Sequence, residues 1–317
     1  MTNLNKKKFF PTIDEFSDKD FINNFVFNKN VVRIVFKKLK IIDSSISEYH
    51  LLFFLDYCIL NTTFLERSSK FNICSRTYSN CVWKIANISK SLRNKTNLDE
   101  RFKFKVEDLA NDSSGHFLTL VVDSIYIPFA TSDQSFYNSN YKKGSGRGVK
   151  FQITCDSMGE VFSIHGPYKA PASDIAIFRE TMTNFPFSEG ERFIGDKGYS
   201  GESSKILTPH KENQTGLTSK QKLENKFIKR NHSVVENVFS LLRRFGFMDM
   251  AWATHLPKLK DSVFLIIYLY NTSIKLNKKL TDNTSIKDEK NKDDENDENN
   301  ENNDIEQFKT DCTGSFS

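Results

Sequence analysis

Three acidic residues stand in apolar surroundings, where an unpaired charge is costly. Asp123 lies within the run VVDSIYIPF, Asp196 ends the short run FIGD, and Glu236 lies among valines in SVVENVF. Carboxylates that come together repel one another and resist deprotonation unless a cation lies between them. Oxygen ligands of this kind suit Mg²⁺ or Mn²⁺. Two such ions about 4 Å apart could flank a scissile phosphate, so these residues predict phosphodiester chemistry by a two-metal mechanism.

Each acid taken alone also has a plain structural explanation. An aspartate just before a glycine, as in the segment GDKGY around Asp196, commonly forms a turn. A glutamate in an amphipathic helix usually faces solvent, which would account for Glu236. Asp123 is the hardest to explain in this way, because it lies inside an apolar strand. The interpretation therefore depends on the combination of the three residues.

The order of predicted elements indicates how these acids could meet. Residues 116–130 are rich in β-branched and aromatic side chains, and residues 149–168 read as a hairpin that turns at DSMG. A helix capped by Ser173 follows, then a short strand ending at Asp196, then an amphipathic helix over residues 231–246 closed by Gly246. Three antiparallel strands followed by crossings through helices are the layout of an RNase H-like α/β domain. We expect this domain over residues 111–277.

The two ends of the chain have a different texture. Residues 1–110 read as mostly helical, and residues 64–88 read as helix, short turn, helix. That pattern fits a helix-turn-helix that offers its second helix to DNA, and it fits a plain helical hairpin equally. The DNA-facing residues would be Arg76, Thr77, Asn80 and Lys84. Residues 278–317 are acidic and almost free of apolar residues, which predicts a disordered tail.

Charge is unevenly divided along the chain. Residues 281–317 hold twelve Asp or Glu and four Lys, which gives them a net charge of −8. The overall net charge is +5, so residues 1–280 carry a net charge of +13. A body this basic fits a polyanion partner such as DNA, although ordinary solubilising charge would look the same. No apolar run is long enough to span a bilayer, and we expect no membrane association. Five cysteines without a Cys-x-x-Cys pair argue against a disulfide scaffold or a zinc site.

Four segments in order carry a resemblance to a known family: VVDSIYIPF, the glycine-rich segment from YKKGSGRG to PASDIAIF, FIGDKGYSGESSKILTPHK, and NKFIKRNHSVVENVFSLLRRF. They resemble the DDE superfamily endonucleases, and the chain is similar to a Harbinger-type transposase or a nuclease derived from one. The resemblance covers residues 117–271. It implies a DNA endonuclease with a central triad of Asp123, Asp196 and Glu236. The divalent metal ligands that it implies are Asp123, Asp174, Asp196 and Glu236.

The chain departs from the family pattern at three places. Ser124-Ile125 replace a common Gly-Thr, Ser173 replaces a frequent His, and His232 stands where an Arg often precedes the glutamate. Relatives often act with a separate Myb-like DNA-binding protein, which the resemblance implies as a partner. It also implies work in the nucleus if the chain is eukaryotic, and in the cytoplasm otherwise. Two alternatives remain: a DNA-binding protein that has lost catalysis, and a protein-interaction module that uses the helical half and the tail.

Overall fold

The computed structural model describes residues 9–60, 62–92, 97–107, 116–141, 146–212, 216–252 and 255–278. The predicted acidic tail, residues 278–317, lies almost wholly outside these ranges. Contacts divide the chain into two compact units, Met1–Thr272 and Ser273–Ser317, and the fold described below is that of the first unit. The predicted division at residues 110 and 277 stays a prediction. No helix within the described ranges combines the length and apolar character that crossing a membrane requires.

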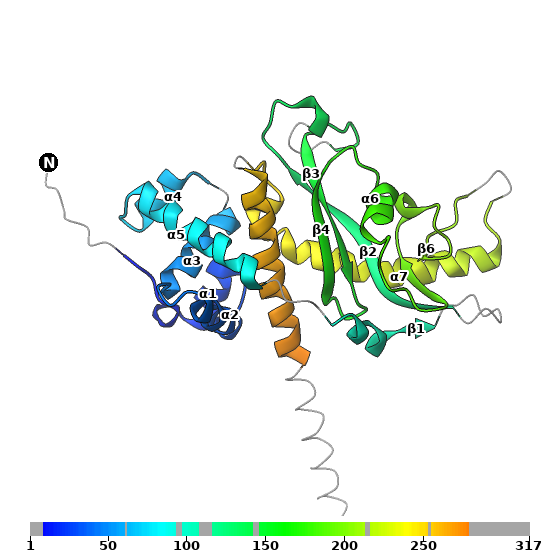
Figure 1. Ribbon diagram of the computed structural model, residues 1–317, viewed down its shortest axis with the longest axis horizontal. Helices are drawn as coiled ribbons and strands as arrows, with labels where there is room; N and C mark the ends of the chain where they lie inside the picture. The colour runs from blue at the N-terminus through cyan, green and yellow to red at the C-terminus, as the bar shows by residue number, and fades with distance from the viewer. Residues whose placement is uncertain are drawn as a thin grey trace, which may run out of the picture. The chain divides into compact units, whose positions relative to one another are not determined.

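The N-terminal region is helical, as predicted (Figure 1). Its helices are α1 (Asp18–Phe25), α2 (Lys29–Ile42), α3 (Glu48–Leu60), α4 (Phe64–Lys70) and α5 (Ser75–Ile88), with short 3-10 turns at Ile13–Glu15, Ser89–Leu92 and Leu98–Phe104. Helix α3 is apolar on nearly every side, and its central residues, Leu51 to Leu55, are at most 1% exposed. A helix of this kind is stable only when neighbours cover all of its faces. Helices α1, α4 and α5 contact it.

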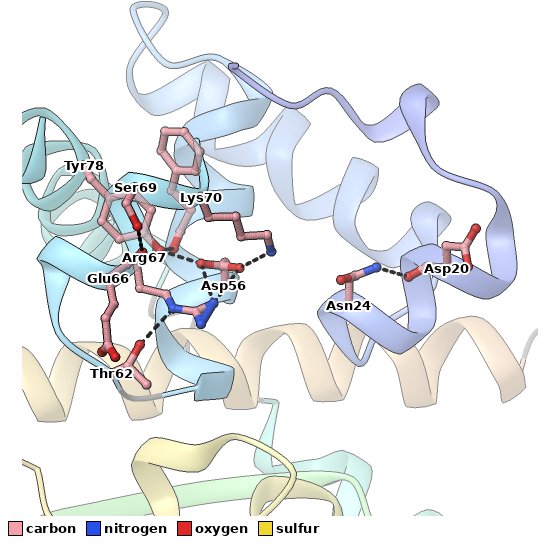
Figure 2. Close-up of polar contacts among 10 residues, drawn as sticks. Asp20, Asn24, Asp56, Thr62, Glu66, Arg67, Ser69, Lys70 and Tyr78 are labelled. Atoms are coloured by element: carbon pink, nitrogen blue, oxygen red, sulfur yellow. Dashed lines mark hydrogen bonds and ion pairs between the residues drawn. The ribbon is translucent and has the colours of Figure 1, made fainter. Parts of the chain in front are cut away.

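A buried carboxylate fixes α4 and α5 against α3 (Figure 2). Asp56 of α3 is 3% exposed and accepts hydrogen bonds from Lys70 Nζ at 2.9 Å and Tyr78 OH at 2.8 Å. Arg67 Nη1 of α4 lies 3.3 Å from Asp56 Oδ1. Because a buried charge is tolerated only when it is paired, these donors stabilise one arrangement of the three helices. Whether α4 and α5 serve as a DNA-binding helix-turn-helix stays a prediction.

The second part of the chain forms one mixed sheet, consistent with the predicted RNase H-like fold (Figure 1). Its strands are β1 (Val106–Glu107), β2 (Phe117–Pro128), β3 (Gly148–Cys155), β4 (Val161–Lys169), β5 (Glu191–Ile194) and β6 (Ile206–Leu207). The order is β4-β3-β2-β5-β6, and β1 pairs with β2. Strand β3 runs antiparallel to both β2 and β4, whereas β5 lies parallel to β2 and β6 parallel to β5. The predicted hairpin of residues 149–168 is thus confirmed.

Helices pack against both faces of the sheet. Side chains alternate between the faces along β2. Leu120 and Val122 join a buried cluster with Phe178 of α6 (Asp174–Thr181), so the α6 face receives the even-numbered residues. Asp123 therefore points to the opposite face, which α7 (Ser219–Leu242) contacts. A further helix covers residues 256–278.

Helix α7 differs from its predicted bounds at both ends. It begins after the N-cap Thr218, whose side chain and that of Gln221 form a capping box, twelve residues before the predicted start. It ends at Leu242 rather than at Gly246. Gly246 has another role, because a Cβ there would lie 2.4 Å from the backbone oxygen of Ile59. The absence of a side chain lets this segment pack directly on the end of α3.

Candidate active site

The pairing of β2 with β5 places the first two predicted acids next to each other. Val121 of β2 pairs with Ile194 of β5 in a parallel register. Asp123 lies two residues beyond Val121, and Asp196 lies two residues beyond Ile194. Parallel strands carry equivalent positions forward together, so both aspartates reach the same edge of the sheet. This register could not be read from the sequence.

Asp123 is the most enclosed acid of the group. Its side chain is 22% exposed, and its Oδ1 accepts a 2.7 Å hydrogen bond from the N–H of Ser124. Burial, opposed by the Ser124 N–H and assisted by the charges of Asp196, Asp174 and Glu236, raises the pKa of Asp123 to about 7. The other three predicted acids therefore lie within electrostatic reach of Asp123. Their roles as ligands and catalysts stay a prediction.

Asp196 and Asp174 flank a glycine. Asp196 is exposed, and its Oδ1 accepts a 2.8 Å hydrogen bond from the N–H of Gly198. A Cβ at Gly198 would lie 2.9 Å from Asp196 Oδ1 and 3.0 Å from Asp174 Oδ2. Contacts at about 3 Å are closer than real Cβ atoms normally make, so a side chain here would push the carboxylates outward. The absence of a side chain at Gly198 thus leaves space for the carboxylates of Asp174 and Asp196. Asp196 also forms a turn with Gly198, as its plain structural explanation predicted.

Asp174 already has a cation beside it. Lys150 Nζ lies 3.0 Å from Asp174 Oδ1 and donates a 2.8 Å hydrogen bond to the backbone oxygen of Ala172. Lys150 is 4% exposed and comes from β3, on the α6 side of the sheet. Asp174 therefore differs from the other three acids, because a fixed ammonium group balances its charge.

Helix α7 contributes two residues, Glu236 and His232, to this region. His232 stands one helical turn before Glu236, and its Nδ1 lies 3.8 Å from Glu236 Oε1. Its Nε2 lies 3.8 Å from Asp123 Oδ2. The pKa of His232 is lower than usual, because the effect of burial outweighs the opposing effect of the charges of Asp196 and Glu236. The side chain of Glu236 is 70% exposed, so this acid is free to turn toward its neighbours or away from them.

Sequence reasoning missed two residues that the structure brings to this region. Lys150 is a charged residue inside the apolar strand VKFQITC, which is the same signal that singled out Asp123. Tyr199 is fully buried on the α6 face, and its hydroxyl lies 3.1 Å from Ser124 Oγ. Only its place in GDKGY marked it in the sequence. Lys150 and Tyr199 thus contact Asp174 and the neighbour of Asp123, respectively, and neither is a further candidate metal ligand.

The donor chemistry of the site fits a hard divalent cation, because its acids offer only carboxylate oxygens. His232 Nε2 lies 3.8 Å from Asp123 Oδ2 and is a buried nitrogen with no hydrogen-bond partner among the described residues. Within the described ranges, however, no three His, Cys, Asp or Glu side chains already stand close enough together to hold a metal ion. The exposed side chain of Glu236 is the one with most freedom to complete such a group.

Comparison with known proteins supplies an independent finding. Residues 122–271 match the family described as DDE superfamily endonuclease. The match begins one residue before Asp123 and includes Asp174, Asp196 and Glu236. No curated protein and no solved structure matches the chain.

Proposed function

Because residues 122–271 belong to the DDE superfamily endonuclease family, of the Harbinger transposase type, we propose that this chain is a divalent-metal-dependent DNA endonuclease. One observation carries the proposal. The parallel register of β2 and β5 puts Asp123 beside Asp196, while α7 brings Glu236 to the same place. The charges of Asp174, Asp196 and Glu236 oppose ionisation of Asp123, and a cation bound there would relieve that repulsion.

Asp123, Asp196 and Glu236 would hold the metal, with Asp174 as a fourth candidate ligand. Bound divalent ions, Mg²⁺ or Mn²⁺, would supply the positive charge that activates water and stabilises the leaving oxygen. In the reaction a water oxygen bonds to phosphorus as the phosphorus–oxygen bond to the leaving group breaks. One DNA end then carries a phosphate monoester and the other a hydroxyl. Lys150 would keep Asp174 in place by charge pairing.

Exposed cations on the segments that carry the candidate ligands support DNA as the substrate. Lys197 next to Asp196 is exposed, and so are Arg230, Arg243 and Arg244 in and just after α7. Side chains of this kind neutralise backbone phosphates and make binding salt-dependent. Together with the net charge of +13 on residues 1–280, they favour a polyanion over a small substrate. The family resemblance further supports a Myb-like DNA-binding partner and, in a eukaryotic cell, a nuclear location.

The direct test is nicking of supercoiled plasmid by the full chain with Mg²⁺ or Mn²⁺. We expect metal-dependent nicking that EDTA abolishes and that Asp196→Ala lowers by about 100-fold or more. Asp133→Asn is the matched control, because Asp133 is an exposed loop acid of the same domain whose Oδ1 accepts a hydrogen bond from Ser135 N–H.

Two results would contradict the proposal. Nicking that survives Asp196→Ala would mean that the activity belongs elsewhere. No nicking by the wild-type chain, with salt-sensitive DNA binding intact, would favour a scaffold that binds DNA without chemistry. Loss of DNA binding as well would favour a protein-interaction module.

A further inference from the structure

One imidazole lies between two of the candidate metal ligands. His232 Nε2 is 3.8 Å from Asp123 Oδ2, and His232 Nδ1 is 3.8 Å from Glu236 Oε1. The three side chains come from two elements, since Asp123 belongs to β2 and the other two to α7. The imidazole therefore belongs to the place where the two elements meet, and not to the solvent face of α7.

The nitrogen that faces Asp123 is buried and lacks a hydrogen bond to any residue that the structure describes. No group within the described ranges donates to His232 Nε2 or accepts from it. Buried polar atoms in folded proteins are nearly always hydrogen-bonded, and an exception calls for an explanation such as a catalytic role or an unseen ion. A metal ion shared with Asp123 would satisfy this nitrogen.

The spacing of the donors permits such sharing. Ligands about 2.0–2.2 Å from one ion can lie no more than about 4.4 Å apart. The 3.8 Å from His232 Nε2 to Asp123 Oδ2 falls within that limit. Glu236 faces the other ring nitrogen, with its Oε1 3.8 Å from His232 Nδ1, so its 70% exposed side chain would have to turn to share an ion bound at Nε2.

We propose that His232 supplies a nitrogen ligand, so that the site is a mixed nitrogen–oxygen site that selects a transition-metal ion such as Mn²⁺ over Mg²⁺. The inference rests on the proposed function of the same site and adds its metal selectivity. The reason is ligand preference: Mg²⁺ strongly prefers oxygen and keeps its water, whereas imidazole binds first-row transition metals. A site made only of carboxylates would lack this discrimination.

The test is Mn²⁺ binding by the full chain, followed by electron paramagnetic resonance with Mg²⁺ as the competitor. We expect electron spin echo spectra of bound Mn²⁺ to show nitrogen modulation, and we expect its frequency to change when the histidines are ¹⁵N-labelled. This measurement uses the wild-type chain and so does not depend on whether a variant folds. We expect His232→Gln to abolish the modulation and to lower the preference for Mn²⁺ over Mg²⁺ by about 10-fold or more.

His210→Gln is the matched control. His210 is another histidine of the same domain, but it contacts Glu224 instead of the site. We expect this variant to keep both the nitrogen modulation and the metal preference.

The outcomes separate this inference from the function on which it rests. Mn²⁺ binding without nitrogen modulation, or an unchanged preference in His232→Gln, would overturn the nitrogen ligand while metal-dependent nicking upheld the nuclease. Absence of any Mn²⁺ binding would overturn the inference as well, and plasmid nicking with Mg²⁺ would then decide the fate of the proposed function separately.

Discussion

Asp56 in the helical region and Asp123 in the sheet are both enclosed aspartates, yet their surroundings are opposite. The Asp56 carboxylate accepts hydrogen bonds from a lysine, an arginine and a tyrosine hydroxyl (Figure 2). Asp123 accepts a hydrogen bond from one backbone N–H, and the charges of three further acids act on it. The first arrangement balances a charge and stabilises the fold. Within the described residues, the second places no lysine or arginine in an ion pair with Asp123, and folding alone does not favour such a buried acid.

The sheet itself shows that this difference does not depend on the region of the molecule. Glu191 at the start of β5 is 2% exposed, and Arg101 Nε at 2.7 Å and Thr119 Oγ1 at 2.6 Å both donate to its Oε1. Burial by itself would raise the pKa of Glu191, but these hydrogen bonds and the Ser188 N–H together hold the pKa below its usual value. The same domain thus pairs the buried Glu191 with an arginine, whereas the charges near Asp123 are mostly those of other acids.

The largest loss of stability is expected from Glu191→Gln, because it leaves the buried Arg101 guanidinium without its counterion. We expect the free energy of unfolding at pH 7 to fall by about 3–5 kcal/mol, measured by urea denaturation. Since the pKa of Glu191 is lower in the folded state, its contribution is present above its unfolded pKa and is lost as pH falls through the folded pKa. The difference between wild type and variant should therefore shrink below about pH 4. A difference that is constant with pH would contradict this account.

Asp56→Asn should cost less, because Lys70, one of its partners, is half exposed and can turn to solvent. We expect the free energy of unfolding to fall by about 2 kcal/mol. Asp20→Asn is the control: Asp20 lies in the same helical region but is exposed, and its side chain accepts a hydrogen bond from Ser17 Oγ. Equal effects of the two substitutions would show that the buried cluster adds no stability of its own.

Asp123→Asn should have the opposite sign. In EDTA, we expect it to raise the free energy of unfolding by about 1–2 kcal/mol at pH 8, because it removes a charge that burial and three acids oppose. The folded pKa of about 7 lies above the unfolded value, so the wild-type penalty grows as pH rises toward 7 and is complete above it. The gain should accordingly be smaller at pH 5 than at pH 8. A destabilised variant at both pH values would remove the contrast with Asp56.

Gly198→Ala should change stability least, by about 1 kcal/mol, because the atoms that its Cβ would meet are mobile carboxylate oxygens and one Asp174 carbon. We nevertheless expect plasmid nicking to fall by about 10-fold or more, since small displacements of catalytic groups cost rate. Gly201→Ala offers a comparison nearby, where a Cβ would meet only Arg179 at 3.2 Å. Because Gly201 has a positive φ of 122°, its substitution should cost stability more than activity.

Much of the architecture was readable because its signals are local. The apolar strand around Asp123, the hairpin of residues 149–168 and the amphipathic helix that carries Glu236 each follow from a period of two or 3.6 residues. Helix ends were less readable. Helix α5 begins after Cys74, which is not a common cap residue, and the Cys74 Sγ lies 3.0 Å from Thr77 Oγ1. The two-residue strands β1 and β6 are too short for any pattern, and only pairing defines them.

The sequence by itself determined which residues carry charge into apolar segments, because that depends on neighbours along the chain. It therefore singled out Asp123 and predicted its partners Asp196 and Glu236. Only the tertiary structure decided that Lys150 balances Asp174, that Gly198 separates two carboxylates and that His232 lies between Asp123 and Glu236. These contacts join different strands and helices, and their distances follow from sheet register and helix packing. No local sequence pattern fixes the sheet register or the helix packing. The surroundings of each acid are therefore known only from the folded structure.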